Sequence, residues 1–223
     1  MATNATSMTS PIVSLNIGTV RISEYKDKEQ RSGIVKSTVT ERLHLGHTGF
    51  TGDEQADLVN HGGPDKAVCV YPLDHYPHWE SVLGRSLPYG SFGENFSISG
   101  LLEPDVCIGD IFSAGSAVVQ VSQPRQPCWK LAMRWGLDEL PALVTQSGAT
   151  GFYFRTLTEG EVGGGDQLRL LDRHAKGLTV AEANRIMHLD KEDVVGIRAL
   201  LDVDALSASW VKTLTARLER LNG

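Results

Sequence analysis

The sequence lacks several features that mark common protein classes. It has three cysteines and no C-x-x-C pair, so neither a disulfide framework nor a zinc knuckle is predicted. No apolar run approaches the roughly 18 residues that would span a bilayer. Positive charge is also scarce, because 21 Lys and Arg face 27 Asp and Glu for a net charge of −6. The lack of a long apolar run argues against a membrane protein, and the negative net charge argues against binding to a nucleic-acid polymer. The lack of a disulfide framework leads us to expect a cytoplasmic protein.

The motifs of the commonest nucleotide-binding and hydrolytic enzymes are missing as well. There is no Walker loop, no G-x-G-x-x-G after a strand and no G-x-S-x-G. His44, His47 and Asp53 carry metal-ligating groups, but their spacing on a β-rich segment is not that of a helical zinc-protease motif. The chemistry is therefore expected to depend on other residues.

Short apolar runs bounded by Gly, Pro and Asn predict strands along most of the chain. The expected strands are 11–18, 66–72, 116–123, 151–157 and 166–172. The Gly-rich segment 160–165 is expected to form the turn between the last two strands. Helices are expected at 73–83 and at 137–148, the latter with Pro141 in its first turns. Many short strands favour a mostly-β fold, a closed barrel with a few short helices over 11–172, after a disordered leader over 1–10.

The pattern becomes helical after Lys176. Thr179 and Glu182 have the spacing of a capping box, and a second amphipathic helix follows over 190–201. A third places apolar residues on one face: Trp210, Leu214, Leu218 and Leu221. Residues 178–223 are therefore predicted to form a small three-helix domain, which must pack on the barrel or on a second subunit. Whether these helices form a homodimer interface is an open question, because their pattern does not decide the oligomeric state.

Two short runs are richer in reactive groups than a structural role requires. In the run at 61–66, HGGPDK, glycines and a proline make a tight turn flanked by His61, Asp65 and Lys66, which suits a loop that grips an anion. In FGENF at 92–96, Glu94 and Asn95 lie between two phenylalanines that point inward if the segment is a strand. There they are placed to bind a heterocycle. Each run also has a structural explanation, as an exposed turn and as a bulge.

A third run, QPRQPCWK at 123–130, surrounds a thiol with positive charge. Arg125 and Lys130 lie within three residues of Cys128, and a helix is expected to begin nearby with Pro127 in its first turn. Cations and helix N-termini lower the pKa of a thiol, so the run favours a thiolate that acts as nucleophile or metal ligand. Cys69 and Cys107 fit an inert role, because each lies within an apolar strand.

In chain order, HGGPDKAV, FGEN, IGD at 108–110, QPRxPCxKL and GFYFR resemble the YiiM branch of the MOSC proteins (molybdenum cofactor sulfurase C-terminal domain). The resemblance covers about residues 12–172, and the tail from 178 is similar to the three-helix domain that follows the barrel in this branch. It implies a β-barrel that binds a molybdenum cofactor, with Cys128 as the protein ligand to the metal. It also implies reduction of N-hydroxylated compounds, such as the base analogue 6-hydroxylaminopurine.

For such a reductase, the resemblance and the residues together suggest the following roles. The cofactor's phosphate needs cations, for which the candidates are Lys66, Arg125, Lys130 and Arg155, with Glu94 and Asn95 as further polar contacts. His61 or Asp65 would pass a proton to the departing hydroxyl. Electrons are expected from a separate reductase, because the sequence has no flavin, haem or iron–sulfur motif. Two alternatives stay open: sulfur transfer through a Cys128 persulfide, and a carrier that binds the cofactor without turnover.

Overall fold

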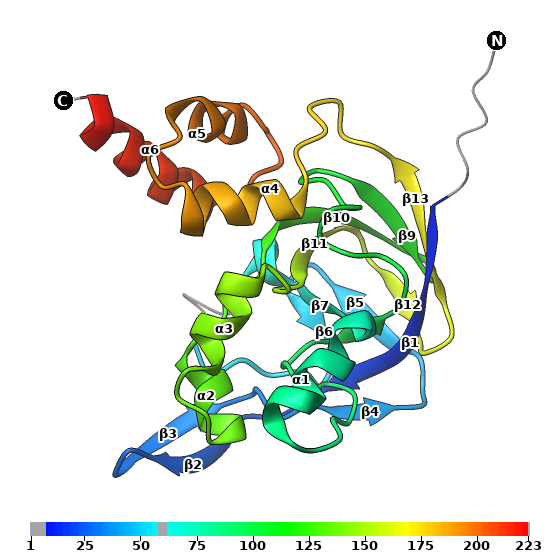
Figure 1. The fold of residues 1–223 in the computed structure, drawn as a ribbon. Coiled ribbons are helices and arrows are strands. Elements are labelled where there is room, and N and C mark those ends of the chain that lie inside the picture. The colour runs from blue at the N-terminus through cyan, green and yellow to red at the C-terminus, as the bar shows by residue number, and fades with distance from the viewer. Residues whose placement is uncertain (1–7, 58–61, 223) are drawn as a thin grey trace.

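A computed structural model describes residues 8–57 and 62–222 of the chain. Its centre is a sheet that closes on itself, in the order β13-β9-β10-β11-β7-β8-β1, after which β1 pairs again with β13 (Figure 1). These strands are β1 (Thr9–Ile17), β7 (Val68–Pro72), β8 (Phe96–Ile98), β9 (Ile111–Ala114), β10 (Ala117–Pro124), β11 (Phe152–Thr158) and β13 (Gln167–Asp172). A short strand, β4 (Ser37–Val39), extends the sheet beside β1. The predicted mostly-β closed barrel is confirmed.

The first strand begins earlier than the sequence suggested. Thr9 and Ser10 already belong to β1, where they lie opposite Arg169 and Leu168 of β13. This pairing closes the barrel, because β1 and β13 are the two ends of the seven-strand order. The predicted leader over 1–10 is therefore too long by these two residues, while residues 1–7 lie outside the described part of the chain.

Within the described ranges, six of the neighbouring pairs around the barrel are antiparallel and one, β7 with β8, is parallel. A parallel pair needs a crossover connection, because the chain must return to the same end of the sheet. Here residues 73–95 make that connection, which contains the short helical turn η2 (Leu73–His75) and α1 (Tyr76–Leu83). This crossover includes the FGEN run.

The Gly-rich segment 160–165 is more than a turn. Its first residues form β12 (Gly160–Val162), which pairs with β5 (Leu43–Gly46), and β5 pairs in turn with β6 (Gly49–Phe50). Sequence analysis missed this small sheet because its strands have two to four residues, too few to show a period-two pattern.

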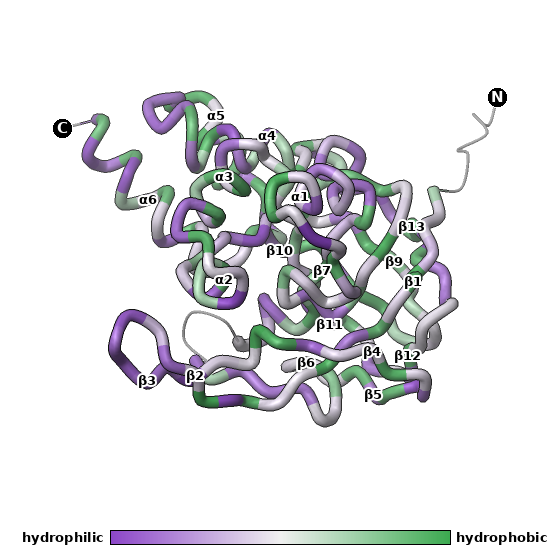
Figure 2. Tube along the Cα trace, turned by 60° about the horizontal axis from the view of Figure 1, so that its bottom comes forward, coloured by the Kyte–Doolittle hydropathy of each residue, from purple (hydrophilic) through white to green (hydrophobic). Residues whose placement is uncertain are grey.

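A hydrophilic hairpin, β2 (Arg21–Tyr25) and β3 (Lys28–Ser32), projects from the barrel (Figure 2). Lys26 and Asp27 connect the strands with φ angles of 52° and 58°, the left-handed values that a tight two-residue hairpin turn requires. The ring of Tyr25 stacks on that of Trp129 at 5.9 Å between centroids. Its hydroxyl donates to Asp138 at 2.6 Å. The hairpin is therefore held against the helix that begins at Trp129.

Three helices cover one side of the barrel over a second apolar cluster. They are α1, α2 (Trp129–Trp135) and α3 (Leu140–Ser147), and Pro141 stands in the first turn of α3 as predicted. The cluster beneath them includes Tyr71, Trp79, Phe92 and Leu131, all nearly inaccessible to solvent. This packing fixes α2, which begins directly after Cys128.

The C-terminal residues form the predicted three helical segments. These are α4 (Val180–Asn184), continued by a π-helical turn (η3, Arg185–Leu189), then α5 (Val194–Leu201) and α6 (Ala208–Asn222). Thr179 and Glu182 make the predicted capping box. Val180, Ile197 and Trp210 belong to the same apolar cluster as the barrel core, so the helices pack on the barrel (Figure 1). None of the helices found in 8–57 and 62–222 has the length and apolarity to cross a membrane.

Candidate functional site

Cys128 lies at the junction between a barrel strand and a helix. β10 ends at Pro124, and α2 begins at Trp129 with Cys128 as its N-cap, in an extended conformation with φ −136° and ψ 172°. Pro127 was predicted to lie in the first turn of this helix. In the structure it lies before the helix. Cys128 is half-buried, whereas Cys69 and Cys107 are buried as expected.

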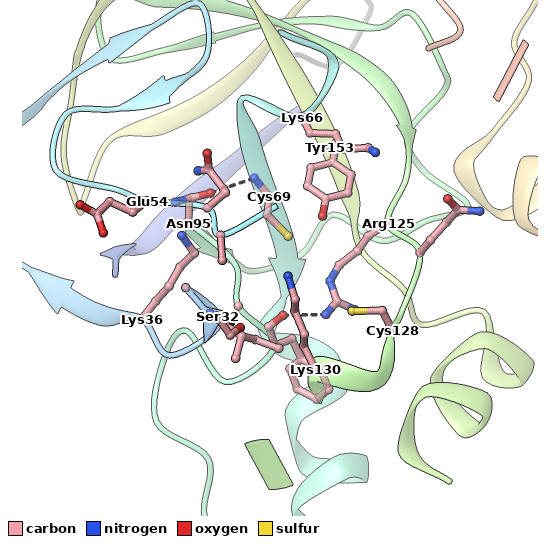
Figure 3. A pocket seen from close by; sticks show the side chains of 17 residues that line it. Ser32, Lys36, Glu54, Lys66, Cys69, Asn95, Arg125, Cys128, Lys130 and Tyr153 are labelled. Atoms are coloured by element: carbon pink, nitrogen blue, oxygen red, sulfur yellow. Dashed lines mark hydrogen bonds between the residues drawn. The ribbon is translucent and has the colours of Figure 1, made fainter. Parts of the chain in front are cut away.

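A pocket brings Cys128 together with residues from distant parts of the sequence (Figure 3). Its walls come from the segment after β3, from residues 54–56, from η1 (Pro64–Lys66), from β7, from the FGEN loop, from the run around Cys128 and from β11. The lining residues are Ser32, Gly33, Ile34, Lys36, Glu54, Gln55, Ala56, Lys66, Cys69, Phe92, Gly93, Asn95, Arg125, Gln126, Cys128, Lys130 and Tyr153. Four of the nine candidate residues named from the sequence line it in addition to Cys128.

The lining of this pocket is mainly cationic, although the protein as a whole is acidic. It contains four cationic side chains, Lys36, Lys66, Arg125 and Lys130, and one carboxylate, Glu54. Burial lowers the pKa of Lys66, which Asp65 and Asp57 partly oppose. Asp53 behind the wall pairs with Lys36, yet the lining still carries more positive than negative charge, which favours an anionic ligand.

Arg125 is the most deeply placed cation, with 5% of its surface exposed. Its Nη2 donates to the backbone carbonyl of Phe92 at 2.7 Å, while its Nη1 is buried with no hydrogen-bond partner among the described residues. Burial acts to lower the pKa of Arg125, but interaction with Cys69, Tyr153 and Cys128 outweighs it and the pKa lies above its ordinary value. Figure 3 shows the Cys128 sulfur turned toward this guanidinium. A permanent cation with an unused donor therefore lies beside the thiol.

A buried carboxylate, Asp53, organises one wall of the pocket. It forms a salt bridge with Lys36 and accepts hydrogen bonds from the backbone N–H of Gly18 at 2.9 Å and from Gln55 Nε2 at 3.2 Å. It also accepts from Asn95 Nδ2 at 2.9 Å. A buried charge is tolerable only when it is paired and hydrogen-bonded, and Asp53 meets both conditions. Sequence analysis missed this role of Asp53, because three of its partners, Gly18, Lys36 and Asn95, are far away along the chain.

Asn95 lines the pocket as predicted, but its amide is already in use. Nδ2 donates to Asp53 and to the backbone carbonyl of Asn16 at 3.1 Å, and Oδ1 accepts from the backbone N–H of Cys69 at 3.0 Å. Both donor hydrogens are thus spent inside the protein. The structure assigns Asn95 to holding β7 and Asp53 in place and not to donating to a ligand.

The prediction that Glu94 contacts a ligand does not fit the structure. Glu94 is fully buried behind the pocket wall and accepts hydrogen bonds from the hydroxyls of Tyr76 at 2.5 Å and Ser97 at 2.9 Å. The backbone N–H groups of Gly90 and Phe92 donate to it at 2.9 and 2.8 Å. The segment is a loop and not a strand, since β8 begins only at Phe96, although Phe92 and Phe96 are both buried. Glu94 therefore holds the conformation of this loop through buried hydrogen bonds and does not face the pocket.

Asp65 and Arg155 likewise lie outside the pocket lining. Arg155 Nη2 pairs with Asp65 Oδ1 at 2.8 Å, and Asp65 Oδ2 accepts from the backbone N–H of Ala208 at 3.0 Å. Ala208 is the first residue of α6, so Asp65 ties η1 to the C-terminal domain. Proton transfer by Asp65 and phosphate contact by Arg155 stay predictions, and in this structure the two side chains pair with each other. His61 lies outside the described residues.

Cys69 and Tyr153 are pocket residues that sequence analysis did not select. They are cross-strand partners in the pairing of β7 with β11, so both reach the same wall. Burial raises the pKa of the Cys69 thiol to about 11, and burial also raises the pKa of Tyr153. Both groups therefore keep their protons near neutral pH. The register of the two strands was the signal that could have found them.

These differences predict selective labelling of the three thiols. With iodoacetamide at pH 8, we expect Cys128 to be modified first, because Cys69 and Cys107 are buried and burial raises the pKa of each. Raising the pH toward 11 should increase labelling of Cys69, since the thiolate fraction grows as the pH approaches its pKa. Peptide mass spectrometry follows each site. Labelling of Cys69 as fast as Cys128 at pH 8 would contradict this assignment.

The histidines considered for zinc do not gather with Asp53. His44 lies 3.5 Å from Glu159 and 3.3 Å from Glu161, whereas Asp53 is bonded to Lys36 in the pocket wall. Across 8–57 and 62–222, no group of three or more His, Cys, Asp or Glu side chains is arranged to hold a metal ion.

Comparison with known proteins agrees with this architecture. The family model of the MOSC domain matches residues 57–169, and the model of the YiiM-like, 3-alpha helix domain matches residues 178–221. A Bacillus subtilis (strain 168) relative, "Uncharacterized protein YflK", is 50% identical over 94% of this chain and 95% of its own length. The crystal structure of YiiM from Geobacillus stearothermophilus is 39% identical, with a TM-score of 0.80 over 94% of this chain and 99% of that one.

One further relative bears a name that describes an activity. A protein of Gibberella moniliformis (strain M3125 / FGSC 7600) named "Reductase" is 33% identical over 70% of this chain, which corresponds to 29% of that protein. The matched part is thus a minor portion of a much longer chain.

Proposed function

This chain belongs to the MOSC-domain family, in the branch that carries the YiiM-like three-helix domain, and from this premise we propose that it is a molybdenum-cofactor-dependent reductase of N-hydroxylated compounds. The observation that carries the proposal is the pocket in which the half-buried Cys128 thiol lies among Lys36, Lys66, Arg125 and Lys130. A relative named as a reductase supports the reaction class.

The residues of the pocket suit such a cofactor. A soft thiolate is a fitting ligand for molybdenum, and Cys128 is the thiol that is not sealed in the core. The buried Nη1 of Arg125 lacks a partner among the described residues, and an anionic group in the pocket would supply one. The pocket is narrow, with a volume of about 80 Å³, so it would hold only part of such a cofactor.

In this mechanism the bound cofactor supplies the two-electron redox chemistry. The N–O bond of the substrate breaks, the nitrogen gains a hydrogen, and the hydroxyl leaves as water after taking up a proton. Cys128 would hold the metal, and Arg125 and Lys130 would balance negative charge beside it. Burial lowers the pKa of Lys66, which lines the pocket, so Lys66 could release a proton there more readily than an exposed lysine does. Tyr153, whose pKa is raised by burial and by the neighbouring Cys69, would keep its proton in the pocket wall.

The reaction consumes two electrons for each substrate molecule, and these must come from outside the chain. We therefore propose a separate reductase as the electron-donating partner, with a small N-hydroxylated molecule such as 6-hydroxylaminopurine as the substrate. The same activity would detoxify N-hydroxylated base analogues in the cytoplasm.

The test of this proposal measures both binding of the cofactor and reduction of a substrate. The protein is purified from a host that makes the cofactor, and its molybdenum content and the fluorescence of its oxidised pterin are measured. Reduction of 6-hydroxylaminopurine is then followed with a chemically reduced viologen dye as electron donor. We expect bound molybdenum and formation of adenine. Sulfane sulfur on Cys128 without molybdenum would instead indicate sulfur transfer, and bound pterin without turnover would indicate a carrier.

A further inference from the structure

Three successive carbonyl groups of the FGEN loop region accept hydrogen bonds from the segment of chain that contains Cys128. These are the backbone carbonyls of Gly90, Ser91 and Phe92. Their donors, in the same order, are Arg134 Nη1 at 2.6 Å, Trp135 Nε1 at 2.9 Å and Arg125 Nη2 at 2.7 Å. The first two donors belong to α2, which begins directly after Cys128, and the third lies three residues before the thiol. The loop is therefore attached to the same short stretch of chain that carries the thiol.

The same nitrogen of Arg134 also holds a second wall of the pocket. Nη1 donates to the backbone carbonyl of Ile34 at 2.7 Å, and Ile34 lines the pocket. The two walls are in contact with each other, because a Cβ atom placed on Gly93 would lie only 3.0 Å from Ile34 Cγ1. One side chain of α2 thus fixes both walls relative to the helix that begins after Cys128.

The chemistry of arginine suits this position. Burial lowers the pKa of Arg134, and the charge of the nearby Glu94 carboxylate opposes this effect. A guanidinium still remains charged near neutral pH, and its planar shape directs its hydrogens so that one group can hold two carbonyls at once. Arg134 does not itself line the pocket. Any effect that it has on a ligand must therefore act through the backbone to which it is bonded.

We propose that Arg134 is a positioning residue that sets the width of the Cys128 pocket, and hence the size of the group that can reach the thiol. The pocket has a volume of about 80 Å³, and three of its lining residues, Ile34, Phe92 and Gly93, belong to the walls that Arg134 holds. Without these hydrogen bonds the two walls are free to move away from α2, and the pocket widens. The consequence for a bound cofactor rests on the proposed function, whereas the consequence for access to the thiol does not.

Two thiol reagents of different size measure the width of the pocket. Modification of Cys128 by iodoacetamide and by the bulky N-(1-pyrenyl)maleimide is followed by peptide mass spectrometry, and each rate is divided by the rate of the same reagent with glutathione. Both reagents attack the thiolate, so the ratio of the two normalised rates, bulky over small, cancels a change in the pKa of Cys128. In Arg134→Met we expect this ratio to rise about tenfold, the effect of losing a hydrogen bond from a charged group.

Two control variants separate pocket width from other effects of a substitution. Arg198→Met makes the same chemical change at an exposed position of α5 and should leave the ratio unchanged. Leu214→Ala removes buried apolar contacts in α6 and lowers stability without touching either wall, so it should leave the ratio unchanged as well. A rise in Leu214→Ala as large as that in Arg134→Met would overturn the proposal, because it would attribute the effect to lost stability alone.

A milder variant keeps the test decisive if Arg134→Met does not fold. Trp135→Phe removes the hydrogen bond to Ser91 but keeps an aromatic ring beside Arg134, whose guanidinium lies 5.3 Å from the Trp135 ring centre. We expect the ratio to rise about threefold, the effect of losing one neutral hydrogen bond. An unchanged ratio in folded Arg134→Met, or in Trp135→Phe where Arg134→Met does not fold, would refute the role of Arg134.

Molybdenum analysis of the same preparations distinguishes a failure of this proposal from a failure of the proposed function. A chain that binds no molybdenum, but in which Arg134→Met raises the labelling ratio, would contradict the proposed function and support the role of Arg134. A chain that binds molybdenum, but in which folded Arg134→Met leaves the ratio unchanged, would support the function and overturn the role of Arg134.

Discussion

Replacing the Cys128 thiol by a hydroxyl, in Cys128→Ser, is expected to remove bound molybdenum and to lower reduction of an N-hydroxylated substrate by at least about 100-fold. A serine hydroxyl is a harder and far less acidic ligand than a cysteine thiol, so it cannot replace a thiolate at a soft metal centre. Loss of a supporting contact around a metal already costs about 10- to 100-fold in affinity or activity, and loss of the ligand should cost more. Metal analysis and dye-coupled turnover measure the two effects.

Cys107→Ser is the matched control for this substitution. Cys107 is buried and does not line the pocket, and its sulfur accepts from Arg173 Nη1 at 3.0 Å. It should retain molybdenum and activity even if its stability falls. Should Cys128→Ser keep its metal and its turnover, the thiol would not be the ligand and the proposed reaction would lose its basis.

The largest effect on stability is expected from Glu94→Leu, which should lower the free energy of unfolding by about 3–5 kcal/mol. The four groups that donate to the Glu94 carboxylate would remain buried without an acceptor: two hydroxyls and two backbone N–H groups. For a chain of this size such a loss corresponds to a fall of about 10 °C in melting temperature. Denaturant titration and thermal unfolding both report it.

Glu219→Leu makes the same chemical change at an exposed position of α6 and should alter stability by less than about 0.5 kcal/mol. The comparison separates loss of the buried hydrogen bonds from the general effect of removing one negative charge. Equal melting temperatures for the two variants would show that Glu94 does not support the loop.

The sequence was most informative where the site is local. Arg125, Cys128 and Lys130 lie within one short run, and the strand before it and the helix after it both have clear patterns, so their proximity could be predicted. The barrel and the three C-terminal helices were predictable for a similar reason, because their apolar periodicity and the Thr179–Glu182 cap are short-range signals.

The rest of the site depends on contacts that span long stretches of chain. The β1–β4 pairing and the hydrogen bond from the Gly18 backbone N–H to Asp53 bring Lys36 and Asp53 together at the pocket wall. The β7–β11 register places Cys69 beside Tyr153. The chemical type of a side chain was also a poor guide to its contacts. Glu94 and Arg155 carry groups suited to a cofactor, but Glu94 is buried among protein donors and Arg155 pairs with Asp65. Side-chain chemistry indicates what a residue can do, and strand register decides where it acts.

The odd number of strands in the barrel has a consequence for where a pocket can arise. Around any closed ring, strand direction must reverse an even number of times, so seven neighbouring pairs cannot all be antiparallel. One like-directed pair is obligatory, and it falls between β7 and β8. Here the two strands of that pair are consecutive in the chain, so they need a crossover connection, and this connection carries Phe92, Gly93 and Asn95 to the pocket beside Cys128. The odd number of strands thus requires one parallel pair, and the crossover that joins this pair forms part of the pocket wall around the thiol.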